Sequence, residues 1–264
     1  MKNWPIRSFF SRHMATLAVG TLLALCVSAQ DGRAFEPAST GSFRVLELAA
    51  YSPKSGQGDT LDRQNSWSIF HKDEKSTVSI YYPQMDNALI DGQLAHWADV
   101  RLRTFVTGVA ALGEGKSRYS MQIDYTLSQT SPRFVSVLFR ISTETGGTRP
   151  DLGLTAFSYD LQTGQTLSYG DIFVEPESFM VFAANYAQED LLRRLGRSER
   201  TLILRGTAPS EGNFAYFTLR PDGLEIFFPP YQVASSSLGE QSVVIPLTKL
   251  APYGPDPKIW GAKK

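Results

Sequence analysis

Two stretches of the chain repeat apolar residues at helical spacing. In residues 90–112 the apolar side chains recur every three to five positions, and Asp86 or Asn87 can cap the start of the helix. In residues 180–195 they recur in the same way behind Pro176, which the first turn of a helix tolerates. The pattern therefore predicts two long amphipathic helices, each burying one face.

Elsewhere the pattern is typical of strands. From Tyr119 to Leu127 apolar and polar residues alternate strictly, which indicates a strand with one buried and one wet face. Turns are expected at Gln162-Thr163-Gly164 and Pro221-Asp222-Gly223. The other strand-like runs are 67–70, 78–82, 134–141, 154–161, 214–219, 224–228 and 243–245. We therefore expect an α+β fold with two antiparallel sheet regions, each packed by one helix.

The N-terminus has the layout of a secretory signal peptide. A positive leader precedes an uncharged, mostly apolar run at 14–29, which is shorter than the roughly 20 residues of a spanning helix. Cleavage is expected after Ala29 or Ala34, and either leaves a formal charge of −3. Cys26, the only cysteine, lies within this run. We thus expect a periplasmic or secreted protein that has no thiol or disulfide and no membrane span after cleavage.

The expected organisation follows from these patterns. A seam between two halves is most plausible at Gly146–Pro150, and one domain or two remain open. The expected segments are a signal peptide at 1–34, a flexible lead-in at 35–65, an N-terminal α+β half at 66–150, a C-terminal α+β half at 151–253 and a loose tail at 254–264.

Composition narrows the class of protein. The 264 residues include 26 basic and 26 acidic side chains, and 42% are hydrophobic. These values are typical of a globular protein with a true core and argue against disorder. A balanced charge argues against a general nucleic-acid binder.

Catalytic motifs are weak. Without its leader the chain retains only His71 and His96, which excludes a three-histidine zinc site, so we expect no metal and no cofactor. The Gly-Lys-Ser run at 115–117 resembles a phosphate loop, but it follows a helix and precedes a strand, the reverse of the required order. We assign no catalytic residue.

Aromatic residues are candidates for binding. The densest cluster is Phe227-Phe228-Pro229-Pro230-Tyr231. Exposed Tyr rings commonly bind sugar rings or anchor protein partners. Tyr231 and Phe227 are therefore the candidate ligand-binding residues, although core packing explains such a cluster more often.

The C-terminal half resembles a known family in the order of its motifs. These are a D-L-x-T-G turn at 160–164, a D-I-F element at 171–173 and a D-G-L-x-x-x-F-x-P-Y-x-V-A stretch at 222–234. One departure is that Thr148-Arg149 follows the Gly-Gly pair where the family often has a small residue and a histidine. In these motifs the chain resembles the PdaC/RsiV-like extracytoplasmic domain family. This domain occurs in lysozyme-sensing anti-sigma factors and as an accessory region of peptidoglycan deacetylases.

The resemblance implies a fold more than a site. The matching residues that we interpret as structural are Asp160, Gly164, Asp171, Phe173, Asp222, Gly223 and Phe228. The resemblance also implies an envelope domain without an attached catalytic deacetylase domain or anti-sigma segment.

Three functional hypotheses follow. The first is a non-catalytic exported bacterial envelope module that binds a cell-wall glycan, such as peptidoglycan, or a lysozyme-like protein. The second is an envelope hydrolase that acts on cell-wall material through carboxylates brought together by the fold. The third is an assembly factor that acts through an edge strand or an apolar patch.

Overall fold

The computed structural model describes residues 44–45, 66–112, 118–147 and 149–261. Every described residue lies within one compact unit of the chain. The expected leader at 1–34, the lead-in apart from residues 44–45, and residues 113–117 of the phosphate-loop-like run lie outside the described residues.

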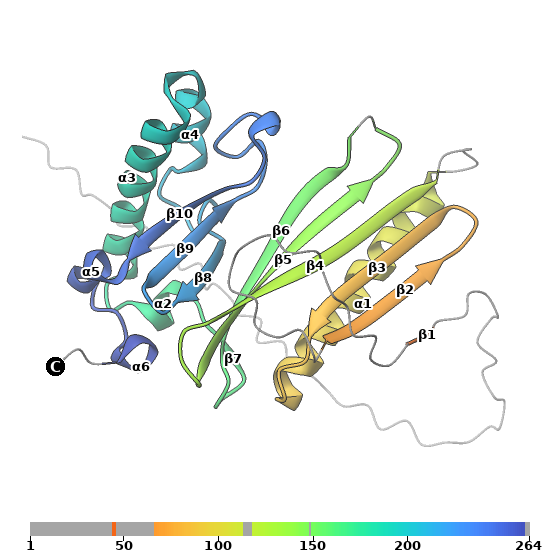
Figure 1. Cartoon of the computed structure of the whole chain (residues 1–264), viewed down its shortest axis with the longest axis horizontal. Coiled ribbons are helices and arrows are strands. Elements are labelled where there is room, and N and C mark those ends of the chain that lie inside the picture. The colour runs from red at the N-terminus through yellow and green to blue at the C-terminus, as the bar shows by residue number, and fades with distance from the viewer. Residues whose placement is uncertain (1–43, 46–65, 113–117, 148, 262–264) are drawn as a thin grey trace, which may run out of the picture. The chain divides into compact units, whose positions relative to one another are not determined.

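The first sheet has seven strands in sequence order (Figure 1). Its strands are β1 (Arg44–Val45), β2 (Ser66–Lys72), β3 (Ser76–Pro83), β4 (Tyr119–Gln129), β5 (Phe134–Glu144), β6 (Asp151–Asp160) and β7 (Gln165–Thr166). Helix α1 (Ala88–Ala111) connects β3 to β4.

The sheet is mixed, which corrects the expectation of purely antiparallel sheets. Strands β3 and β4 pair in parallel, whereas the other neighbours pair antiparallel. A parallel pair needs a crossover connection, and α1 supplies it here. The α+β class, with two sheets and a long helix on each, is confirmed.

Asn87 is the N-cap of helix α1, and its side chain accepts hydrogen bonds from the backbone N–H groups of Leu89 and Ile90. Its apolar stripe packs on one face of the first sheet. The buried residues of this core are Val78, Ile80, Tyr82, Ile90, Leu94, Ala98, Leu102, Met121, Ile123, Tyr125, Val135, Val137, Phe139 and Tyr159.

The second sheet has three strands in the order β10-β9-β8. They are β8 (Tyr216–Arg220), β9 (Gly223–Phe228) and β10 (Gln241–Pro246). Helix α3 (Pro176–Leu195) packs on one face through Phe179, Met180, Ala183, Ala184, Ala187 and Leu191. The remaining elements are α2 (Tyr169–Ile172), η1 (Arg197–Glu199), α4 (Arg200–Gly206), η2 (Ser236–Leu238), α5 (Leu247–Leu250), η3 (Ala251–Tyr253) and α6 (Pro257–Trp260).

The β8 side of the second sheet packs against the face of the first sheet that is opposite α1. Strand β5 is therefore buried on both faces from Phe134 to Phe139. Leu138 on β5 and Leu154 on β6 form a small core with Phe227 of β9. This packing explains why burial in β5 is continuous from Phe134 to Phe139, whereas burial in β4 alternates.

Two segments differ from the sequence expectation. Strand β6 lies beyond the expected seam at Gly146–Pro150, yet it pairs with β5 along its whole length, so the first sheet continues to Thr166. The tail expected to be loose from residue 254 contains α6, whose Ile259 is buried. The indole N–H of Trp260 also donates to the carbonyl of Arg220 at 2.8 Å, which holds the tail to the second sheet.

Among the helices of the described ranges, none combines the length and the apolar character that a membrane crossing needs.

Candidate functional site

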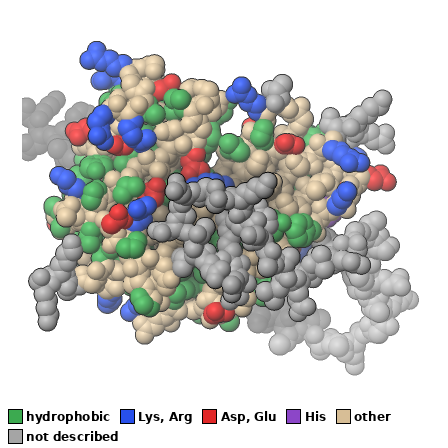
Figure 2. All heavy atoms as spheres, in the orientation of Figure 1, with side chains coloured by type: hydrophobic (Ala, Val, Ile, Leu, Met, Phe, Trp, Pro, Cys, Tyr) green, Lys and Arg blue, Asp and Glu red, His purple; other side chains and the backbone are tan. Residues whose placement is uncertain are grey.

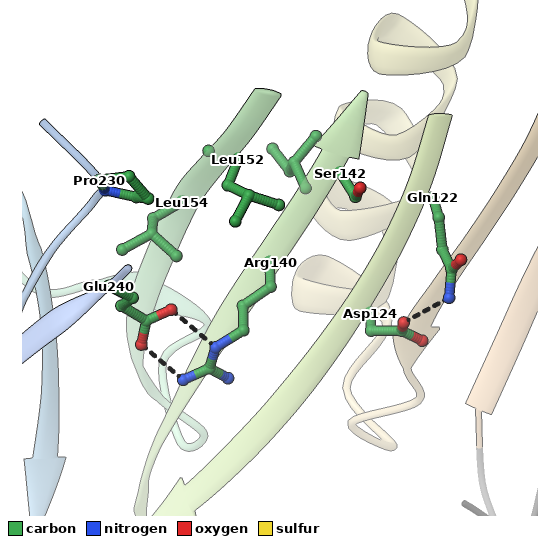
Figure 3. A pocket seen from close by; sticks show the side chains of 10 residues that line it. Gln122, Asp124, Arg140, Ser142, Leu152, Leu154, Pro230 and Glu240 are labelled. Atoms are coloured by element: carbon green, nitrogen blue, oxygen red, sulfur yellow. Dashed lines mark hydrogen bonds and ion pairs between the residues drawn. The ribbon is translucent and has the colours of Figure 1, made fainter. Parts of the chain in front are cut away.

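A cleft of about 220 Å³ opens on the face of the first sheet that is opposite α1 (Figure 3). Strands β4, β5 and β6 form its floor, and the segment between β9 and β10 contributes Pro230 and Glu240. The lining residues are Gln122, Asp124, Arg140, Ile141, Ser142, Leu152, Gly153, Leu154, Pro230 and Glu240. Polar side chains on β4 and β5 thus lie beside an apolar wall from β6 and Pro230.

Arg140 is the basic residue that lines the cleft, and Glu240 of the β9–β10 connection forms an ion pair with it. The guanidinium donates from Nε and Nη2 to the two carboxylate oxygens of Glu240, at 2.9 and 2.8 Å. It also donates to the Thr126 hydroxyl at 3.3 Å, and it lies 6.0 Å from the ring centroid of Phe227. This two-point pair joins the first sheet to the β9–β10 connection and fixes the guanidinium plane.

Asp124 is a second carboxylate in the cleft. It stands directly opposite Arg140 in the β4–β5 register. The guanidinium turns away from it towards Glu240 (Figure 3), and Asp124 instead accepts a hydrogen bond of 2.8 Å from the Gln122 amide. Among the described residues no cation pairs with Asp124.

Tyr231 directly follows Pro230, which lines the cleft. Its side chain is 67% exposed, and its backbone has φ 70°, a left-handed conformation that favours glycine. The N–H of Gln232 donates to the carbonyl of Pro229 at 3.2 Å, so Tyr231 occupies the third position of a four-residue turn. The fold therefore presents this ring to solvent at a cost in backbone strain.

Phe227, in contrast to Tyr231, is buried beneath the cleft. It is only 7% exposed and packs against Leu138 and Leu154 beneath Arg140. Its ring is thus part of the wall that supports the cleft, and it offers no exposed face.

Asp160 and Gly164 form the D-L-x-T-G turn after β6. Arg133 hydrogen bonds the Asp160 carboxylate and holds the pKa of Asp160 below its usual range. Gly164 has φ 73°, and a Cβ there would stand 3.0 Å from Leu89 of α1. The Asn87 amide also donates to the carbonyl of Leu161 at 2.8 Å, so this turn packs against the first turn of α1.

The other motif residues also lie in turns, caps and core. Asp171 accepts hydrogen bonds from the N–H and the hydroxyl of Ser168 at the start of α2. Phe173 and Phe228 are buried in the core that α3 shares with the second sheet. Arg220 hydrogen bonds Asp222 and lowers its pKa, and a Cβ on Gly223 would stand 2.1 Å from the carbonyl oxygen of Ile245.

His71 lies near the end of β2, next to the turn that leads to β3. Its ring and Asp73 are 2.9 Å apart, and the Ser76 hydroxyl donates to the same carboxylate. Burial raises the pKa of Asp73, but hydrogen bonds from His71, Ser76 and Lys75 outweigh it and lower the value to about 2. Serine donates to the acid rather than to the histidine, which is not the order of a nucleophilic triad. His96 is exposed on α1, and no group of three metal-ligating side chains occurs within the described ranges.

On the face shown in Figure 2, acidic and basic side chains lie interspersed among apolar ones. Surface charge on this face therefore does not mark a binding site, and the cleft is the candidate instead. Sequence reasoning missed Asp124, Arg140 and Glu240. Their only signal is that they are polar residues in or beside strands, which many surface residues share.

The fold and several motifs occur in known proteins. Residues 170–248 match the family model described as a protein of unknown function, DUF3298. A DUF3298 protein from Pseudomonas aeruginosa PAO1 has a similar structure, with a TM-score of 0.55 and 13% identity over 75% of this chain and 97% of that one. A second, from Bacteroides fragilis NCTC 9343, has a TM-score of 0.50 and 16% identity over the same shares. The α+β fold is thus shared with solved DUF3298 structures.

The chain is also 28% identical over 170 residues to peptidoglycan-N-acetylmuramic acid deacetylase PdaC of Bacillus subtilis strain 168. The alignment covers 63% of this chain and 36% of PdaC, so the chain corresponds to about a third of that protein. The resemblance to a PdaC-like domain family is confirmed.

Proposed function

We propose that this protein is a non-catalytic, exported module of the bacterial envelope that binds a cell-wall glycan in the cleft around Arg140. The observation that carries the proposal is the pairing of a polar floor with an apolar wall. A sugar ring has hydroxyl and amide groups at its edge and apolar C–H faces. Fixed polar side chains can hydrogen bond the edge while leucine and proline contact a face.

Four further features support the proposal. The Arg140–Glu240 pair holds the floor rigidly, which lowers the entropic cost of binding. Tyr231 offers an exposed ring next to Pro230. The similarity to a peptidoglycan deacetylase favours the cell wall as the place of action, and the leader pattern at 1–34 favours export.

The test is a binding measurement on the purified chain. We expect it to sediment with insoluble peptidoglycan and to bind N-acetylglucosamine oligomers in calorimetric titration. Leu152→Ser removes an exposed leucine from the cleft wall and should weaken binding several-fold. Val181→Ser is the matched control, because Val181 on α3 is equally exposed, at 53%. Equal effects of the two variants, or no binding at high micromolar concentration, would overturn the proposal.

A lysozyme-like protein is the other partner that the resemblance suggests. A pull-down on immobilised lysozyme tests it with the same two variants. Binding to lysozyme that Leu152→Ser leaves unchanged, without binding to any glycan, would replace the glycan proposal.

Hydrolysis is the alternative that one observation favours, because two carboxylates, Asp124 and Glu240, line the same cleft. Arg140 already occupies both oxygens of Glu240, which opposes a role as proton donor or nucleophile. Release of soluble muropeptides from peptidoglycan that is lost in both Asp124→Asn and Glu240→Gln would establish the hydrolase instead.

A further inference from the structure

The charges of the cleft do not cancel. Arg140 and Glu240 neutralise each other through two hydrogen bonds, which leaves Asp124 as the surplus charge. Asp124 receives one neutral hydrogen bond, from the Gln122 amide. A carboxylate has about four lone-pair sites, and among the described residues Gln122 occupies one of those of Asp124, which lines the cleft.

The side chains of Asp124 and Arg140 have different hydrogen-bond partners, although they lie on neighbouring strands. Although they stand opposite each other in the β4–β5 register, the bidentate pair and the Thr126 hydroxyl hold the guanidinium on the Glu240 side (Figure 3). Gln122 comes from the same face of β4 as Asp124 and fixes its carboxylate from the other direction. Asp124 is thus held in place before any ligand arrives.

We infer that the cleft selects glycans that carry a free, protonated amine, with Asp124 as the specificity-determining residue. This inference rests on the proposed glycan-binding function. An ammonium group offers three donors and a full positive charge, and it complements a carboxylate that pairs with no cation in the described part of the chain. An N-acetylated sugar offers one weaker amide donor in the same place. The ligand class is therefore a glycan with de-N-acetylated amino sugars.

Calorimetric titration of the whole chain with two oligomers tests the inference. The probes are a hexamer of glucosamine, which carries free amines, and a hexamer of N-acetylglucosamine. We expect the parent chain to bind the free-amine hexamer roughly threefold to tenfold more tightly, as a partly exposed charge-assisted contact would provide. Asp124→Asn should remove this preference, so that the ratio of the two affinities falls to about one.

Asp86→Asn is the matched control. The Asp86 carboxylate also accepts a hydrogen bond from the glutamine two residues before it, Gln84, but it lies outside the cleft. Both variants change the net charge equally. Asp86→Asn should keep the parent's preference, which separates a contact in the cleft from general attraction between an acidic protein and a cationic oligomer.

The outcomes distinguish the two proposals. Equal affinity of the parent for both hexamers, or a preference that survives Asp124→Asn, overturns the inference and leaves the proposed function standing. A preference lost equally in Asp86→Asn also overturns it. Failure of both hexamers to bind overturns the proposed function and the inference together. Asp124→Glu, which keeps the charge, should retain part of the preference and shows that the asparagine variant does not act through misfolding.

Discussion

The hydroxyl of Ser136, on β5, accepts a hydrogen bond of 2.9 Å from the backbone N–H of Leu219, on β8. The Ser128 hydroxyl donates to the carbonyl of the same leucine at 2.7 Å. Strand β8 is the edge of the second sheet, and an unpaired edge leaves backbone groups without partners. Two serines of the first sheet thus satisfy the backbone N–H and carbonyl of Leu219 at this edge, and they link the two sheets at this point.

Replacing Ser136 tests this junction. Ser136→Ala leaves the Leu219 N–H buried without an acceptor and should lower the free energy of unfolding by about 1–3 kcal/mol. Ser158→Ala is the control, because Ser158 is equally buried but bonds only the Ser136 hydroxyl, at 2.8 Å. Urea denaturation should show the larger loss for Ser136→Ala, and equal losses would contradict the role of the edge contact.

Two glycines should respond to alanine in opposite directions. Gly164→Ala places a side chain at φ 73° and a Cβ 3.0 Å from Leu89, so it should destabilise by about 1–3 kcal/mol. Gly92→Ala, inside α1, meets nothing within 4 Å and should stabilise by about 0.5–1 kcal/mol. Thermal unfolding midpoints measure both, and a shift of the same sign in both would disprove the argument.

Acid should weaken the fold in part through Asp160. Hydrogen bonds from Arg133 lower the pKa of Asp160 in the folded state from its ordinary value of 3.8. Its contribution to stability is therefore fully present above about pH 4 and is lost as the pH falls through the lower, folded-state value. Asp160→Asn should destabilise at neutral pH and reduce the further loss as the pH falls below about 4.

The control for this prediction is Asp99→Asn, which removes an exposed carboxylate from a pair with Arg103. Exposed pairs contribute little, so its unfolding free energy should follow the parent's pH dependence. A parent-like acid profile in Asp160→Asn would show that the Arg133 pair does not account for the loss.

Tyr231 should show opposed effects on stability and binding. Tyr231→Gly relieves the left-handed backbone at φ 70° and should leave stability unchanged or raise it by up to about 1 kcal/mol. The same change removes an exposed ring beside the cleft and should weaken glycan binding several-fold. Tyr231→Ala removes the ring without relieving the backbone, so it should weaken binding to the same extent and bring no gain in stability.

Local patterns in the sequence determined most of the secondary structure. The spacing of apolar residues in 90–112 and 180–195 predicted α1 and α3, because an α-helix has 3.6 residues per turn. The turns at Gly164 and Gly223 were predictable because glycine tolerates backbone conformations that other residues rarely adopt. The resemblance to the PdaC-like family rested on these same turns and on the strands beside them.

Only the tertiary structure decided the pairing of the strands and the candidate site. The parallel β3–β4 pair and the packing of β8 on β5 depend on contacts between distant residues, which periodicity does not encode. The cleft has the same origin, since Arg140 and Glu240 stand 100 residues apart in the chain. A polar residue on a strand has no signature until the fold shows what it faces, and for that reason Asp124 could not be distinguished from any other exposed acid.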